Sequence, residues 1–146
     1  MDLDMLFNKT PSSKNMQAEV VWGGSSKMTG INQSGQEIEM DWEDGPSPMQ
    51  ILLQMVGSCS LVDVVHSLEK RRILKSASIS MEAERAQEPP RKFTSIHMIY
   101  HVHGDEIPEK MVNRVIETSL EKYCSVSNTL SADVKITWEL QLNTNL

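Results

Sequence analysis

Alternation of apolar and polar side chains predicts strands in the first third of the chain. The period-two pattern over residues 17–22 is that of a half-buried strand. Two further short strands are expected at 28–31 and 37–42. Gly-Ser and Asn-Gln-Ser-Gly turn signals at 23–26 and 32–35 separate the three segments. The pattern therefore predicts a meander of three short strands.

A long apolar helix is predicted to follow this meander. Ser47 fits the N-cap, Pro48 fits the first helical position, and Gln50 completes a capping box. A helix over residues 48–72 would span roughly 37 Å at about 1.5 Å per residue. Its apolar residues occur on every side of the helix, which favours burial at the centre of the molecule. A helix of this length needs cover from more than one side, so a dimer is favoured.

The second half of the chain predicts two longer strands, a second helix and a last strand. These elements are expected at 75–86, 92–103, 107–122 and 132–142. The resulting order is βββ-α-ββ-α-β, an α+β fold in one domain over residues 16–146. Residues 1–15 are polar and are expected to form a poorly ordered lead-in.

Composition narrows the classes of function. The 146 residues carry a formal charge of −6 and no basic stripe, which argues against a nucleic-acid binder. The basic run Lys70-Arg71-Arg72 is interpreted as the cationic end of the long helix. No apolar stretch is expected to reach the length of a membrane span. The acidic N-terminus does not resemble a secretory signal, and two cysteines make no disulfide framework. These features predict a cytoplasmic protein with reduced thiols.

The two cysteines are the main candidates for chemistry. Cys59 and Cys124 each lie in an apolar, helix-like segment and are far apart in the sequence. If the fold brings them together, they form a candidate peroxide-reducing dithiol. If it does not, they are two small buried hydrophobic residues.

Motifs distributed along most of the chain resemble the OsmC/Ohr family of thiol-dependent peroxide-detoxifying proteins. The resemblance covers about residues 17–142. The matching motifs are Ser47-Pro48, Ile51-Leu52-Leu53, Gly57-Ser58-Cys59-Ser60, Val62-Asp63-Val64, Lys70-Arg71-Arg72, Pro90, Phe93-Thr94, Ile96, Glu121-Lys122-Tyr123-Cys124-Ser125-Val126 and Leu130.

The resemblance implies both a fold and an activity. The fold would be an intertwined homodimer in which sheets wrap two central helices. Cys59 would be the peroxidatic thiol and Cys124 the resolving thiol, forming a sulfenic acid and then a Cys59–Cys124 disulfide. A small apolar organic hydroperoxide would be the substrate, and an external dithiol would reduce the disulfide. No cofactor and no metal would be needed.

Two departures from the family pattern keep an alternative open. The peroxidase branch holds its reactive thiol with an arginine from the N-terminal strands and a glutamate at the start of the long helix. Here Met49 and the neutral Gln50 stand at the start of the helix, and Lys27 is the only cation between residues 16 and 42. Lysine does not reproduce the planar fork of arginine. The alternative is an OsmC-like stress or small-molecule-binding protein without peroxidase activity.

Asp63 and the methionines are interpreted from their place on the long helix. Asp63 lies on an otherwise apolar helix, so a basic residue or backbone donors are expected beside its carboxylate. Met49 and Met55 could line an adaptable pocket for a hydroperoxide, although filling of the core is the favoured interpretation. Gln50 is interpreted as a cap, with a role beside the thiol as the lesser alternative.

Four histidines offer weaker candidates. Two helical turns separate His66 from Cys59, beyond hydrogen-bond reach, so a Cys–His dyad within the helix is rejected. His97, His101 and His103 share one face of a strand. A solvated polar face is favoured there over a zinc site.

Overall fold

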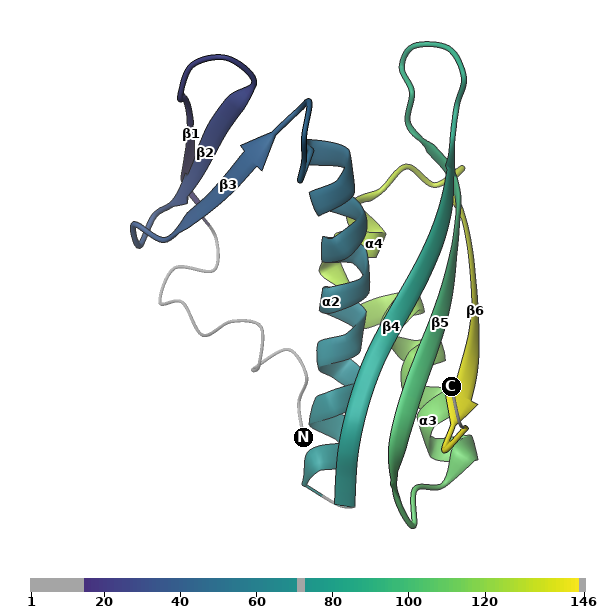
Figure 1. The fold of residues 1–146 in the computed structure, drawn as a ribbon. Coiled ribbons are helices and arrows are strands. Elements are labelled where there is room, and N and C mark those ends of the chain that lie inside the picture. The colour runs from purple at the N-terminus through teal and green to yellow at the C-terminus, as the bar shows by residue number, and fades with distance from the viewer. Residues whose placement is uncertain (1–14, 71–72, 145–146) are drawn as a thin grey trace. The chain divides into compact units, whose positions relative to one another are not determined.

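The elements follow each other in the order that the sequence predicts (Figure 1). The structure is a computed structural model and describes residues 15–70 and 73–144. The predicted lead-in lies outside the described residues except for Asn15. The chain divides into two units, residues 1–52 and 53–146, each treated separately below.

The first unit contains the predicted meander. β1 (Ala18–Trp22), β2 (Lys27–Asn32) and β3 (Glu37–Asp41) form an antiparallel sheet in the order β1-β2-β3. Both connecting turns contain a glycine in the left-handed region, which other residues adopt only at a cost: Gly24 has φ 91° and Gly35 has φ 82°. The three strands and both turns therefore confirm the prediction.

Side-chain oxygens organise the turn between β3 and the long helix α2 (Pro48–Glu69). Asp41 Oδ1 accepts hydrogen bonds from Ser26 Oγ at 2.6 Å and from the backbone N–H groups of Glu43 and Asp44 at 2.9 and 3.1 Å. The hydrogen bond from Ser26, followed by those from the two backbone groups, lowers the pKa of the Asp41 carboxyl.

The capping box at the start of α2 is confirmed. The backbone N–H of Ser47 donates to Gln50 Oε1 at 2.9 Å, and the N–H of Gln50 donates to Ser47 Oγ at 3.3 Å. The helix begins at Pro48, as predicted, and ends at Glu69. Its 22 residues span about 33 Å at about 1.5 Å per residue. Two residues of the expected basic helix end, Arg71 and Arg72, lie outside the described residues.

In a single chain α2 is buried along one face, which differs from the all-round burial that the sequence predicts. The buried residues recur every three to four positions: Val56, Gly57, Ser60, Asp63, Val64 and Leu68. Met55 and Val62 on other sides of the helix are each 38% exposed. The apolar pattern indicates which side chains of the helix are suited to burial. A single chain buries only some of them.

The length of α2 also corrects the expectation about membrane spans. Within the part of the chain that the structure describes, α2 alone is long and apolar enough to cross a membrane by length and composition. The core helix of a soluble protein meets the same criteria. The buried Asp63 and the close packing of α2 on a sheet are the features of such a core helix.

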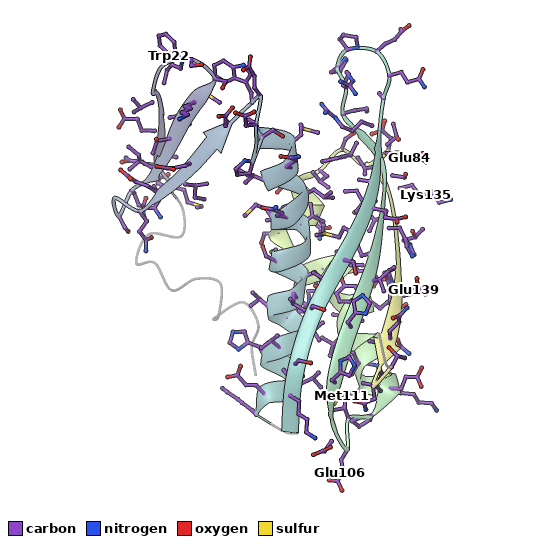
Figure 2. All side chains as sticks on the ribbon, in the orientation of Figure 1. Trp22, Glu84, Glu106, Met111, Lys135 and Glu139 are labelled. Carbon is purple, nitrogen blue, oxygen red and sulfur yellow. The ribbon has the colours of Figure 1, made fainter. Side chains whose placement is uncertain are left out.

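A second sheet forms the core of the second unit. β4 (Ile73–Arg85) and β5 (Phe93–Asp105) are antiparallel, and β6 (Lys135–Leu142) pairs with β5 in parallel. Met98, Tyr100 and Val102 of the central strand β5 are fully buried. On β6, the exposed side chains of Lys135 and Glu139 project from the sheet (Figure 2). The strands begin and end within a few residues of the predicted positions.

The connection from β5 to β6 is more broken than the helix predicted over 107–122. It consists of α3 (Glu109–Thr118), a π-helical turn η1 (Ser119–Tyr123) and the short α4 (Ser125–Thr129). In the π turn the N–H of Cys124 donates to the carbonyl of Ser119, five residues earlier, at 2.7 Å. A parallel pair of strands needs such a crossover.

Helix α2 and strand β4 approach closely at Gly57. A Cβ atom placed on Gly57 would lie 2.6 Å from Met81 Sδ and 3.2 Å from Ile79 Cγ2. Only glycine fits this contact without a shift of its neighbours. The close approach lies two residues before Cys59 and fixes the depth of α2 against the sheet.

Candidate functional site: a pair of thiols beside a buried polar network

The fold brings Cys59 and Cys124 into direct contact. Cys59 lies on α2 and is half-buried, whereas Cys124 lies at the junction of η1 and α4 and is fully buried. Both are free thiols, and they lie close enough for Cys59 to act on the pKa of Cys124. The structure therefore brings together the two cysteines that the sequence singled out, and their catalytic role stays a prediction.

Cys124 is held by its own segment. Its sulfur accepts a hydrogen bond from the N–H of Ser127 at 3.5 Å, and lies 4.0 Å from the carbonyl oxygen of Val56. Burial, above all, raises the pKa of the Cys124 thiol, and the neighbouring Cys59 adds to this effect against the hydrogen bonds from Ser127. A thiol that stays protonated and sealed from solvent suits the second of two redox cysteines better than the first.

A chain of buried polar groups runs beside the two thiols. The hydroxyl of Tyr100 lies 2.6 Å from Ser60 Oγ, which in turn lies 3.0 Å from Ser119 Oγ. The Ser119 hydroxyl donates to Asp63 Oδ2 at 2.5 Å. All four side chains are excluded from solvent. Sequence reasoning missed Ser60, Tyr100 and Ser119; the single available signal was the occurrence of Ser60 and Asp63 one turn apart on an apolar helix.

Asp63 has a different partner from the one expected. Among the residues that the structure describes, the hydrogen bond to its carboxylate comes from the Ser119 hydroxyl, and neither a basic side chain nor a backbone N–H donates to it. Its second oxygen, Oδ1, is buried and has no hydrogen-bond partner within the described residues. Burial raises the pKa of the Asp63 carboxyl, while the Ser119 hydrogen bond and the nearby His66 oppose the rise.

Tyr100 is buried in the same network of polar side chains. Burial raises the pKa of Tyr100 far above its usual value; the hydrogen bond between Tyr100 and Ser60 opposes this rise, and the electrostatic effects of Cys124 and Asp63 add to it. Tyr100 therefore remains a neutral hydrogen-bond donor at physiological pH.

The three histidines on β5 each have a protein partner. His97 bonds to Thr137 Oγ1 at 2.7 Å and Glu139 Oε1 at 3.2 Å, and His103 bonds to the carbonyl of Thr144 at 2.6 Å. His101 contacts Ser80 Oγ at 2.8 Å. It is buried, which contradicts the solvated face that the alternation predicts. Among the described residues no group of three or more His, Cys, Asp or Glu side chains could hold a metal.

The remaining candidate residues belong to the first unit. Lys27 is exposed on β2, Met49 is half-buried in the first turn of α2, and Gln50 is engaged in the capping box. A role for any of them beside the thiols stays a prediction.

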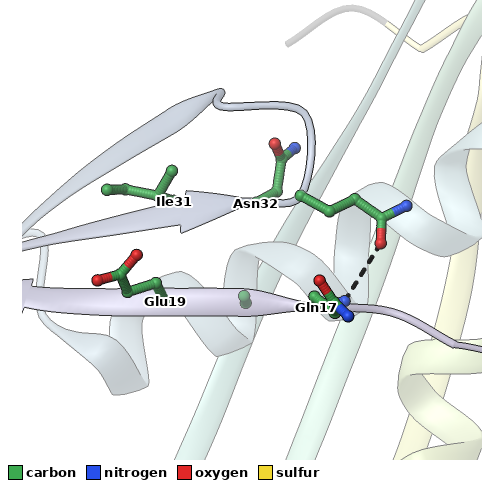
Figure 3. A pocket seen from close by; sticks show the side chains of 6 residues that line it. Gln17, Glu19, Ile31 and Asn32 are labelled. Carbon is green, nitrogen blue, oxygen red and sulfur yellow. Dashed lines mark hydrogen bonds between the residues drawn. The ribbon is translucent and has the colours of Figure 1, made fainter.

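Surface hollows lie in each of the two units, and two of them are described here. One, of about 300 Å³, lies on the open face of α2 and is lined by Ser58, Leu61, Val62, Val65 and His66. The other, of about 220 Å³, lies in the first unit between the ends of β1 and β2 (Figure 3). There the Gln17 N–H donates to Gln33 Oε1 at 3.3 Å, and Glu19 is the only ionisable side chain of the lining. The second hollow shows no arrangement of groups that would select a ligand.

Comparison with known proteins places this chain in one family. The model of the OsmC-like protein family matches residues 41–139, and the chain belongs to this family. Protein YhfA of Escherichia coli K12 is 39% identical over 126 residues, which cover 84% of this chain and 94% of that protein.

Solved structures agree with this assignment. A hypothetical protein from Aquifex aeolicus is 31% identical, with a TM-score of 0.76 over 90% of this chain and 99% of that one. An OsmC-like protein from Mycoplasma pneumoniae shares the fold at 20% identity, with a TM-score of 0.75 over 89% of this chain and 98% of that one. The α+β fold read from the sequence is thereby confirmed.

Proposed function

We propose that this protein is a cofactor-free thiol peroxidase that reduces small organic hydroperoxides in the cytoplasm. The observation that carries the proposal is that a half-exposed Cys59 and a sealed Cys124 are neighbours in the fold. A peroxide can reach Cys59 from solvent, and Cys124 lies beside it. Membership of the OsmC-like family supports a redox function of this kind.

The proposed reaction has two chemical steps. The Cys59 thiolate attacks one oxygen of the peroxide, the O–O bond breaks, and the leaving alkoxide takes up a proton to give an alcohol and a Cys59 sulfenic acid. The sulfur of Cys124 then attacks the sulfenic sulfur, and the leaving hydroxide takes the thiol proton to form water and a Cys59–Cys124 disulfide. An external dithiol returns both cysteines to the reduced state by exchange.

The active form is proposed to be a homodimer. The outer face of α2 carries the apolar hollow lined by Leu61, Val62 and Val65. The first sheet exposes further large apolar side chains, including Val20, Trp22 and Ile38. Soluble proteins rarely leave large apolar patches uncovered. A second copy of the chain would cover both.

A second candidate function is binding of a small apolar molecule without peroxide reduction. The observation in its favour is that Lys27 is the only cation from Met16 to Trp42, and that the side chain of Gln50 is engaged at the helix cap. An activating arginine–glutamate pair is therefore not supplied by these positions.

Peroxide consumption with a dithiol donor separates the two functions. The wild type should consume an organic hydroperoxide over many turnovers. Cys59→Ser should consume none, whereas Cys124→Ser should react once and accumulate a sulfenic acid that a dimedone-type reagent traps. Equal consumption by all three proteins would contradict the peroxidase and favour the binding function.

A further inference from the structure

The buried network connects the two cysteine-bearing segments directly. Ser60 is the residue after Cys59 on α2. Ser119 accepts the backbone N–H of Cys124 through its carbonyl at 2.7 Å. The 3.0 Å contact between the hydroxyls of Ser60 and Ser119 therefore joins the backbone that carries one thiol to the backbone that carries the other.

The direction of each hydrogen bond in this network is determined by Asp63. The Ser119 hydroxyl donates its proton to Asp63 Oδ2. Ser119 must then accept the proton of Ser60, and Ser60 must accept the proton of Tyr100. Ser119 is therefore hydrogen-bonded to two residues of α2, Ser60 and Asp63, which lie three positions apart. Tyr100 of β5 extends the network through its hydrogen bond to Ser60.

The composition of this network calls for a functional reason. Burying a carboxylate and three hydroxyls costs free energy that apolar side chains of similar size would not cost. Within the described residues Asp63 Oδ1 has no hydrogen-bond partner, which adds to that cost. Hydrogen-bonded polar groups in a core favour one geometry where apolar packing tolerates several. The geometry fixed here is that of the segment carrying Cys124 against the helix carrying Cys59.

We propose that Ser60, Ser119 and Asp63 are positioning residues that clamp the Cys124 segment onto α2 and thereby favour the Cys59–Cys124 disulfide. This inference rests on the proposed function, because it takes that disulfide as the product of peroxide reduction. These three residues, called the clamp below, act by holding the Cys124 thiol close to Cys59, which raises the effective concentration of one thiol near the other. Without it, the π turn that holds Cys124 is free to move away from α2.

The equilibrium between the protein thiols and a reference dithiol tests the clamp without any peroxide. Two electrons and two protons pass from Cys59 and Cys124 to oxidised dithiothreitol, which gives the protein disulfide and reduced dithiothreitol. Ser60→Ala should lower the equilibrium constant for disulfide formation about tenfold, which raises the reduction potential by about 30 mV. Asp63→Ala should lower the constant as well, and Asp63→Asn should restore it because the amide oxygen still accepts from Ser119.

The chain offers a matched control on the other side of Cys59. Ser58 is exposed, and its hydroxyl donates to the carbonyl of Met55 in its own helix at 3.3 Å. Ser58→Ala should leave the equilibrium constant within about twofold of wild type, since no contact to the Cys124 segment is lost. If Ser60→Ala does not fold, as judged by circular dichroism, Ser119→Ala deletes the same contact from the other side and carries the same expectation.

The possible outcomes distinguish the clamp from the peroxidase. Constants that are equal for wild type, Ser58→Ala and Ser60→Ala, or for wild type and Ser119→Ala, would overturn the clamp and leave the proposed function intact. A wild type that forms the disulfide with the expected variant pattern but consumes no peroxide would overturn the function and support the clamp. A wild type that forms no Cys59–Cys124 disulfide would overturn both.

Discussion

The two sheets of this protein differ in the solvent exposure of their apolar side chains. In the first sheet Val20, Trp22 and Ile38 are 59, 68 and 52% exposed, and Trp22 lies at the β1–β2 turn (Figure 2). In the second sheet β5 buries Ile96 and Met98 completely. The second unit therefore completes a core within one chain, and its thiol pair is fully assembled there. The first sheet leaves large apolar side chains exposed in a single chain, which is the feature that supports the proposed dimer.

The largest expected loss of stability is that of Ile96→Ala in the second sheet, and Ile38 in the first sheet serves below as its exposed counterpart. Ile96→Ala should destabilise the protein by about 3 kcal/mol, because it leaves a cavity in a fully buried position. The loss should be the same at every protein concentration if the second unit folds within one chain. Urea unfolding followed at several protein concentrations measures it, and a loss below about 1 kcal/mol would contradict a core centred on β5.

A buried charge in the second unit predicts a pH dependence of stability. Asp63 has a raised pKa in the folded protein, because burial disfavours its charged form. Asp63 therefore stabilises the folded protein fully at a pH below its unfolded pKa of about 3.9. This stabilisation is lost as the pH rises through the higher pKa of the folded state. The nearby His66 on the same helix opposes this rise in the pKa of Asp63.

Asp63→Asn should remove this pH dependence while keeping an acceptor for Ser119. The stability of the variant relative to wild type should rise as the pH increases from about 4 towards neutrality. Chemical denaturation of both proteins at a series of pH values measures the difference. A difference that stays constant with pH would show that the carboxyl does not titrate abnormally in the fold.

The smallest change is expected for the exposed isoleucine of the first sheet. Ile38→Ala should alter the stability of the monomer by no more than about 0.5 kcal/mol, as for most surface substitutions. At concentrations where a dimer forms the cost should be larger, because Ile38 would then be covered. Sedimentation equilibrium and unfolding at matched concentrations test this, and an effect independent of concentration would argue against burial of Ile38 in a dimer.

Local chemistry explains which parts of the fold could be predicted from the sequence. The capping box of Ser47 and Gln50 involves residues three positions apart, and the glycines of the β1–β2 and β2–β3 turns act within four residues. The order of strands and helices follows from such short-range patterns. The two cysteines could be singled out because family motifs surround them, although no spacing rule predicts their contact.

Long-range contacts explain what could not be predicted. The hydroxyl contact between Ser60 and Ser119 joins residues 59 positions apart, and serine carries no sequence signal for burial. The π turn before Cys124 looks like ordinary helix in the sequence, because its residues continue the apolar spacing of α3. His101 was assigned to a solvated face because alternation shows which residues share a side of a strand, and not whether that side is covered.

The central claim is that Cys59 and Cys124 act as one redox pair, and peptide mass analysis after peroxide treatment tests it most directly. Protein treated with one equivalent of an organic hydroperoxide, and digested without reductant, should yield a Cys59 peptide joined to the Cys124 peptide of the same chain. The intact chain should be lighter by two hydrogens. Two unlinked thiols after the peroxide has been consumed, or Cys59 oxidised to sulfinic acid with Cys124 unchanged, would contradict the account.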